Sequence, residues 1–532
     1  MNGLLILYQF VRADFLERIR RYSFLITLAA ALCFGYLAVP PAGSKIATLA
    51  LGNIRGIYNT PWVAAMVAIM CSCFLSFIGF YLVKNSLARD KVTRVVEILT
   101  SSPISTFTYL LGKALSNLAL LATLVFVVML SVIPMQFIRG EDTSIQIGQL
   151  IAPFLLMTLP FMAVVAALAV LFEALPVLRG TAGNVIWFFV WMFMIMTATN
   201  LSALPSEKIV PATNDLPGWT VILNSMTTQV VKFDPGYQGE LMIGGWYKAD
   251  QEVRTMVWDG VNWTVPMAAA RCWWLIGAVG VVGLASVFHR RQEGTKSELS
   301  RKPATATPIA VETGTSSATG TSVHLRSLKY PLNFSLQGLV VGELRLAFSS
   351  VGRYWYLIAL GLLTAEFFAP VDVSRRYLLP VAWLWPLPIW SAMGCRERIF
   401  GTEQLVFSTI GMGRRQLSAL LIAAVAVAVL TGLGVFVRFS LAGDWGGLLS
   451  WVGGVIVIPA TAISLGVVSG GRKLFEAVYT LAWYIGPLNG LPHLDFMGVT
   501  KTSAQIGVPI YCLILSLLMM SLAWAKRSRQ MS

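Results

Sequence analysis

Residues 62–83 read WVAAMVAIMCSCFLSFIGFYLV, a run of 22 residues without a single charge. A helix rises about 1.5 Å per residue, so a run of roughly 20 apolar residues is long enough to cross the hydrocarbon core of a bilayer. A core helix of a soluble protein is usually shorter. This run therefore predicts a transmembrane helix, and similar runs recur along the chain.

The composition of the whole chain agrees with a membrane protein. Of its 532 residues, 56% are hydrophobic and only 12% are charged, whereas soluble domains average about 25% charged residues. The chain lacks the polar residues to coat soluble domains, and its apolar content excludes intrinsic disorder. With 6 cysteines and 3 separated histidines, neither a disulfide scaffold nor a histidine metal site is expected.

Twelve stretches are predicted to span the membrane. Those of the first half are 23–40, 62–83, 108–134, 149–172, 184–204 and 267–288; those of the second are 354–370, 377–395, 416–437, 447–468, 474–490 and 507–525. An even number places both termini on one side. With both in the cytoplasm, 28 of the 40 Lys and Arg residues are cytoplasmic, in agreement with the positive-inside rule. We expect an all-α polytopic, multi-pass protein of the plasma membrane, the inner membrane of a bacterium.

The chain is predicted to consist of two parallel repeats of six spans. The domains are a first half 1–290, a flexible cytoplasmic linker 291–335 rich in Thr, Ala and Ser, and a second half 336–532. Each half opens with an amphipathic segment at the membrane interface, residues 4–22 being the elbow helix of the first. Matching prolines, Pro160 and Pro459, lie within the fourth span of each half and are expected to kink it.

The first half carries a polar insert, residues 206–266, on the extracytoplasmic side. Asp259-Gly260 stands between alternating residues, a pattern typical of a two-residue β hairpin turn. The insert is expected to be either a lid that binds a ligand or a small β cap resting on the lipid headgroups.

A charged segment follows the second span of each half. Arg89-Asp90-Lys91-Val92 in the first corresponds to Arg396-Glu397-Arg398-Ile399 in the second. The first segment is predicted to form a short amphipathic helix at the cytoplasmic surface, held between two spans. Such a helix either transmits force from a soluble partner or is a plain interfacial loop, and spacing alone leaves both open.

No motif of an enzyme is present: GxSxG, HExxH, paired Cys-x-x-Cys and a phosphate loop are all missing. Ion-coupled carriers place acids in mid-membrane. Here Glu173, Glu366 and Glu476 lie toward span ends, where they are expected to be end charges, Glu173 and Glu476 with basic neighbours.

Residues 87–115, LARDKVTRVVEILTSSPISTFTYLLGKAL, resemble the coupling segment of permeases of type-2 ATP-binding cassette (ABC) exporters. In that family an acid and a leucine precede Ser/Thr-Pro, and Gly-Lys enters the third span. Glu97, Leu99, Ser102-Pro103 and Gly112-Lys113 occupy those places. The likeness is weaker in residues 396–417, where glycines replace Ser-Pro and Gly-Lys is missing.

The resemblance implies outward transport of an apolar or amphiphilic substrate by a chain that is itself no enzyme and binds no cofactor. Two copies of a cytoplasmic ABC ATPase would bind ATP and Mg; membrane lipids are the other expected partners, and nucleic acid is not expected. The alternatives are a membrane enzyme acting on lipid-linked substrates and an ion-coupled secondary carrier. The candidate coupling residues are Arg89, Asp90, Lys91, Arg94, Glu97, Leu99, Ser102, Pro103, Arg396, Glu397, Arg398, Glu403 and Gln404.

Overall fold

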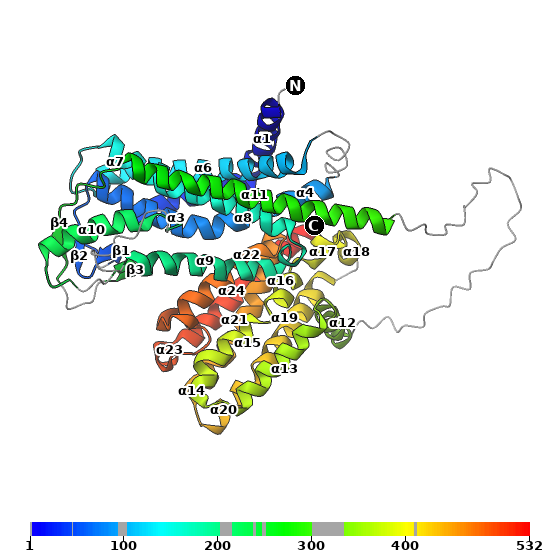
Figure 1. The fold of residues 1–532 in the computed structure, drawn as a ribbon. Coiled ribbons are helices and arrows are strands. Elements are labelled where there is room, and N and C mark those ends of the chain that lie inside the picture. Colours follow the sequence, from blue (N-terminus) through cyan, green and yellow to red (C-terminus); the bar gives the residue numbers. More distant parts are fainter. Residues whose placement is uncertain are drawn as a thin grey trace, which may run out of the picture. The chain divides into compact units, whose positions relative to one another are not determined.

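The computed structural model describes residues 3–44, 46–93, 104–202, 215–237, 241–246, 252–300, 335–408 and 412–531. The chain divides into two compact units, unit 1 (Met1–Lys302) and unit 2 (Pro303–Ser532). Figure 1 labels the elements of both. Each unit is a bundle of helices and is described by itself.

Unit 1 is built from long apolar helices and a small sheet (Figure 1). Two of its long helices begin at side-chain caps: Asn59 accepts from the backbone N–H of Trp62, and Ser105 from that of Thr108. The helices are α1 (Gly3–Ile19), α2 (Tyr22–Ala38), α3 (Thr60–Val83), α4 (Ser86–Val92), α6 (Thr106–Arg139), α7 (Ile147–Pro153), α8 (Leu159–Ala174), α9 (Thr181–Ser202), α10 (Trp219–Phe233) and α11 (Val265–Ser300), with a π-helical turn at Phe154–Thr158 and a 3-10 turn at Pro176–Leu178.

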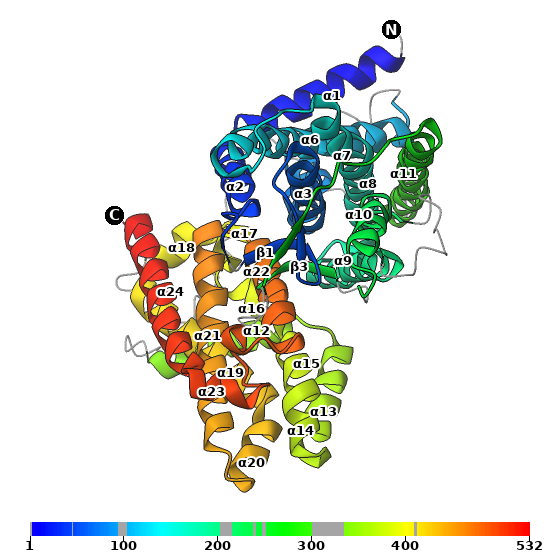
Figure 2. The ribbon, with the colours of Figure 1, turned by 90° about the vertical axis from the view of Figure 1, so that its left-hand side faces the viewer.

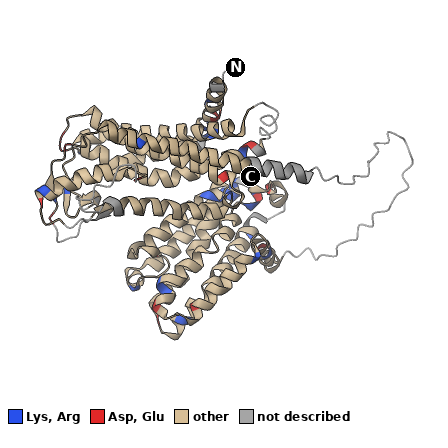
Figure 3. Cartoon of the chain, in the orientation of Figure 1, with Lys and Arg blue, Asp and Glu red and all other residues tan. Residues whose placement is uncertain are grey.

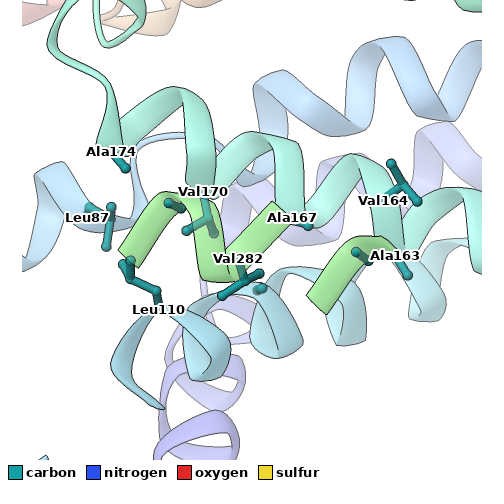
Figure 4. Close-up of a cluster of buried hydrophobic side chains, with 11 residues drawn as sticks. Leu87, Leu110, Ala163, Val164, Ala167, Val170, Ala174 and Val282 are labelled. Atoms are coloured by element: carbon teal, nitrogen blue, oxygen red, sulfur yellow. The ribbon is translucent and has the colours of Figure 1, made fainter. Parts of the chain in front are cut away.

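Helices α6, α8 and α11 share a core of small side chains. Ala163, Ala167 and Ala174 of α8 are buried there, together with Leu110 of α6 and Val282 of α11 (Figure 4). Small residues allow membrane helices to approach closely, which increases their van der Waals contact. This packing holds the end of α8 next to α4, where the charged segment begins.

A four-stranded sheet joins the loop after α2 to the insert. Its strands are β1 (Ile46–Leu51), β2 (Ile54–Gly56), β3 (Leu241–Trp246) and β4 (Arg254–Met256), in the order β3-β1-β2-β4. β1 pairs antiparallel with β2 and β3, whereas β2 pairs in parallel with β4. The hairpin of this sheet is β1–β2, whose turn Gly52-Asn53 has a positive φ of 64° at Gly52.

The hairpin predicted at Asp259-Gly260 is wrong. Residues 257–264, all of them described, contain no strand. Side chains take the hydrogen bonds that a second strand would make: Gln229 donates to the carbonyl of Val257, Asn59 to that of Trp258 and Gln149 to that of Val261.

Unit 2 consists of helices only over its described residues. α24 runs alongside α21, which lies between α24 and α22 in Figure 2. The helices are α12 (Leu336–Ser349), α13 (Arg353–Phe368), α14 (Val371–Val373), α15 (Leu379–Leu384), α16 (Leu387–Met393), α17 (Arg396–Ile399), α18 (Glu403–Phe407), α19 (Met412–Thr431), α20 (Leu433–Leu441), α21 (Trp445–Ser469), α22 (Lys473–Trp483), α23 (Lys501–Ile506) and α24 (Val508–Met531), with π turns at Ser374–Leu378 and Tyr484–Leu488 and a 3-10 turn at Pro492–Leu494.

The described residues contain seven helices that are long and apolar enough to cross a membrane, and up to ten spans if each bent helix pair counts as one. The bent pairs are α1 with α2, α12 with α13 and α19 with α20. Predicted spans 377–395 and 474–490 are not among them, because the first is interrupted between α15 and α16 and the second is short. The polytopic helical fold is confirmed, and the number twelve stays a prediction.

The structure agrees only in part with two further predictions, those for the two prolines and for the linker. Pro160 lies in the first turn of α8, directly after the π turn Phe154–Thr158, whereas Pro459 lies inside α21, which continues unbroken past it. α11 extends to Ser300, so the first ten residues of the predicted linker 291–335 are helical; residues 301–334 lie outside the described part.

Candidate coupling site

Asp14 of α1 is the centre of a buried charge cluster in unit 1. Its side chain is 7% exposed, and its carboxylate lies 2.7 Å from the Arg18 guanidinium, 2.7 Å from the Lys113 ammonium and 2.8 Å from the Arg89 guanidinium. Arg89 also contacts Glu17 at 3.0 Å. One carboxylate thus connects α1, α4 and α6.

Asp90, the next residue of α4, points into the same cluster. Its carboxylate lies 2.8 Å from Lys113 and accepts a hydrogen bond of 2.7 Å from the Tyr109 hydroxyl. Lys113 is 2% exposed and therefore neutralises two buried carboxylates, those of Asp14 and Asp90. Asp90 consequently holds α4 to α6 and is not a surface charge.

Glu173, at the end of α8, caps the other end of α4. Its carboxylate accepts the backbone N–H groups of Asn85, Ser86 and Leu87 at 2.6, 3.0 and 2.7 Å. The first N–H groups of a helix have no partner within the helix, and a carboxylate there is stabilising. Arg179 donates to the main-chain carbonyl of Glu173, as its expected neighbour, but the carboxylate is a buried cap instead of an end charge. Glu366, also expected at a span end, is fully buried.

The same connections recur in unit 2. Arg396 of α17 lies 2.9 Å from Glu343 of α12, the helix before α13. Glu397 accepts 2.6 Å from the Gln416 side-chain amide at the start of α19 and lies 3.2 Å from Arg527 of α24. As in unit 1, an arginine of the charged segment pairs with the first helix of its unit, and the acid that follows the arginine pairs with the next long helix.

The two clusters differ in charge. Where unit 1 has a lysine between two acids, unit 2 has the neutral Gln416, and its second cation comes from α24. Figure 3, which colours the chain by residue type, shows the charged residues mostly near helix ends, with the long helices between them almost free of charge.

The other predicted coupling residues are placed as follows. Lys91 belongs to α4, Arg398 is exposed over Gly470, and Glu403 and Gln404 lie at the start of α18, Gln404 exposed. Arg94, Glu97, Leu99, Ser102 and Pro103 lie outside the described residues.

Sequence reasoning missed the cluster members that come from other helices. Those are Asp14, Glu343, Gln416 and Arg527, and the capping role of Glu173 was missed as well. One signal was present: Asp14 precedes Arg18 by four residues, the spacing of an ion pair on one helix face. The others pair over long sequence separations and left no local signal.

The Asp14 cluster predicts acid sensitivity. Burial raises the pKa of the Asp14 carboxyl, but Lys113 and Arg18 together lower it by more, so that the pKa falls from 3.8 to about 2. A carboxyl with a lower pKa in the folded state stabilises that state above its unfolded pKa and loses this contribution as the pH falls through the folded pKa. The shift corresponds to roughly 2 kcal/mol.

The measurement is the difference in melting temperature between the wild type and Asp14→Asn across pH. We expect the difference to be constant above about pH 5 and to shrink as the pH falls from about 4 toward 2. A difference that stays constant down to pH 2 would contradict a charged Asp14 in this cluster.

A second buried arrangement lies at the start of α10. Trp219 donates to the hydroxyl of Ser72, in the middle of α3, at 2.7 Å. Arg271 of α11 is 1% exposed and donates to the main-chain carbonyls of Asp215, Leu216 (2.8 Å) and Leu156 (3.2 Å). The loop before α10 therefore lies at the level of the middle of α3, and one guanidinium satisfies its carbonyls.

Comparison with known proteins concerns unit 1. Residues 24–288 match the family model described as ABC-2 family transporter protein. The match runs from α2 into α11 and includes the sheet, the insert, α4 and two of the helices that anchor it, α6 and α8, whereas α1 with Asp14 lies before the matched residues. No curated protein and no solved structure matches the chain. Through unit 1, the chain therefore belongs to the ABC-2 family of transporter membrane proteins.

Proposed function

We propose that the chain is the permease of an ABC exporter, which moves an apolar or amphiphilic substrate outward with ATP hydrolysed by two copies of a separate cytoplasmic ATPase. Membership of the ABC-2 family makes it the membrane component of an ABC transporter. The observation that carries the finer proposal is the anchoring of α4, the first charged segment, by buried ion pairs.

Those anchors make α4 a means of transmitting force. Arg89 connects α4 to α1, Asp90 connects it to α6, and Glu173 connects it to α8. An ion pair buried in a low-dielectric interior costs several kcal/mol to break by removing one partner. A partner that pushes residues 87–103 would therefore move three helices together instead of bending a loop.

The repeated cluster in unit 2 supports two coupling segments in one chain. Glu343–Arg396 and Glu397–Gln416 reproduce the connections of Asp14–Arg89 and Asp90–Lys113. One chain would then supply both halves of the permease, each bound to one ATPase with its ATP and Mg. In this proposal the segments and both termini are cytoplasmic, in a bacterial inner membrane, and substrate passes between the two halves.

Purification of the full chain with its ATPase tests the proposal. We expect one copy of this chain and two ATPase copies in the complex, and export that requires ATP hydrolysis. Transport that persists without ATP but collapses with the proton gradient would instead indicate a secondary carrier, and two copies of this chain per complex would contradict the two-half arrangement.

Glu97→Arg is the variant for coupling. Glu97 lies off the apolar face predicted for residues 92–99, so we expect normal amounts of membrane-inserted protein and an approximately five-fold fall in substrate-stimulated ATP turnover, the factor of about 1 kcal/mol. The matched change Gln404→Arg, in the segment that departs further from the family pattern, should have the smaller effect. Normal turnover in Glu97→Arg would show that residues 87–103 are an ordinary interfacial loop.

A further inference from the structure

Helices α21, α22 and α24 of unit 2 enclose a cavity of about 290 Å³. Both α22 and α24 pack on α21, but over their described lengths they do not pack closely on each other. Figure 2 shows α21 between them. The cavity is therefore a cleft with α21 as its floor and the other two helices as its walls.

The inner surface of the cleft is apolar and buried. Val457 and Ile458 of α21, Phe475 of α22 and Cys512 of α24 line it, each less than 7% exposed. The rim is exposed instead: Val478 is 48%, Tyr511 65% and Leu515 41% exposed. The cleft thus opens sideways, between α22 and α24.

Two of the three helices that form the cleft are candidate membrane spans. α21 and α24 are each long and apolar enough to cross a membrane. The lining extends along α21 from Val457 to Leu465, nine residues with a rise of about 12 Å, from the centre of that helix into its C-terminal half. Water in this cavity would find few hydrogen-bond partners, because the hydroxyls of Thr461 and Tyr479 already donate to main-chain carbonyls, so the available filler is hydrocarbon.

We propose that this cleft binds one acyl chain of a bilayer phospholipid. Its volume is at the lower limit of ligand pockets, about 300–1,000 Å³, which suits a single chain. His493, in the turn Pro492–Leu494, is the one basic side chain among the described residues that line the cleft, and it is exposed. The lipid headgroup would lie toward His493, and the chain would lie along α21. The site belongs to unit 2 alone and does not depend on ATPase coupling.

The test uses the full chain in phosphatidylglycerol vesicles that contain a photoactivatable diazirine in mid-chain. We expect cross-links to Ile458, Phe475 and Cys512 that saturate as the labelled fraction of lipid rises. Cross-links to the exposed positions Ile510 and Leu517 should rise in proportion to that fraction. Proportional labelling of the cleft residues would show passing contact only and would overturn the proposal.

Two substitutions on α22 separate occupancy from surface contact. Ala482 lines the cleft and Ala477 does not. Ala482→Phe should reduce cleft labelling at least ten-fold, while Ala477→Phe leaves it unchanged and neither alters labelling of Leu517. Retained cleft labelling in Ala482→Phe would overturn the proposal. If this variant fails to fold, the saturation measurement on the wild type tests the proposal instead.

The occupant is tested by competition. Unlabelled phosphatidylglycerol should compete with the photoactivatable lipid and reduce cross-linking of the cleft. Palmitate added from solution should reduce this cross-linking only as far as it dilutes the labelled lipid in the bilayer. Displacement by palmitate but not by the phospholipid would mean that the cleft binds a soluble fatty acid, contrary to the assignment.

Discussion

Lys113→Met should destabilise the folded protein by about 3–5 kcal/mol, because it removes the single ammonium between two buried carboxylates. Asp14 lies 2.7 Å and Asp90 2.8 Å from the Lys113 amine, which is 2% exposed. Without it, Asp90 keeps only the Tyr109 hydroxyl as a partner. Removing one member of a buried ion pair costs about 3–5 kcal/mol, a large part of the 5–15 kcal/mol that stabilises a typical protein.

The matched control is Gln416→Met in unit 2. Gln416 donates one neutral amide hydrogen bond to Glu397, which retains Arg527 after the substitution. We expect a loss of about 1–3 kcal/mol there. The measurement is the fraction of each purified variant that remains monodisperse after heating. Adding Asp90→Asn to Lys113→Met should restore part of the lost stability, since one uncompensated charge disappears. Equal melting temperatures of all these variants would refute a charged cluster.

The segments that carry these clusters were predictable, but their partners were not. Arg89-Asp90 and Arg396-Glu397 attract notice because charged residues directly follow apolar runs. Their partner acids Asp14 and Glu343 are 75 and 53 residues away in the chain. Which distant helix meets the segment depends on tertiary packing, and periodicity contains no information on it.

The β structure shows how tertiary contacts override a local turn signal. Asp259-Gly260 and Gly52-Asn53 are both dipeptides typical of two-residue turns. Only the second forms a hairpin, because β1 also finds β3 as a partner on its other side. Around Asp259-Gly260 the carbonyls accept hydrogen bonds from side chains of α7, of α10 and of Asn59, the residue that caps α3, so no strand pairing is needed there.

The helical breaks show a second limit. Hydropathy measures composition over a window, and 377–395 is apolar enough on that basis to be predicted as a span. Trp385-Pro386 nevertheless separates α15 from α16, because proline lacks the N–H that would continue the ladder. Its ring also clashes with the carbonyl of the preceding turn. Such a break changes the length of each helix without changing the mean hydropathy.

Arg271→Met is expected to detach the start of α10 from the bundle of unit 1. The guanidinium donates to the carbonyls of Leu156, Asp215 and Leu216 and is 1% exposed. A buried carbonyl without a partner costs roughly 1–3 kcal/mol, and water cannot compensate at the depth of mid-membrane. The carbonyls of Asp215 and Leu216 belong to the loop before α10 and that of Leu156 to the π turn Phe154–Thr158, so a loss of several kcal/mol falls on the contact between loop and bundle.

Arg254→Met, in strand β4 of the insert that contains α10, is the matched control. Arg254 pairs with Asp234 at 2.7 Å, but its side chain is 45% exposed, and exposed ion pairs contribute about 0–1 kcal/mol. Limited proteolysis of the purified chain in detergent measures the difference. Arg271→Met should be cut rapidly near Asp215 at a temperature where Arg254→Met and the wild type resist. Trp219 anchors the same loop to Ser72 through one neutral hydrogen bond, so Trp219→Phe should be cut at a rate between those of the wild type and Arg271→Met. If Trp219→Phe is cut as fast as Arg271→Met, the indole and not the guanidinium holds α10 in place.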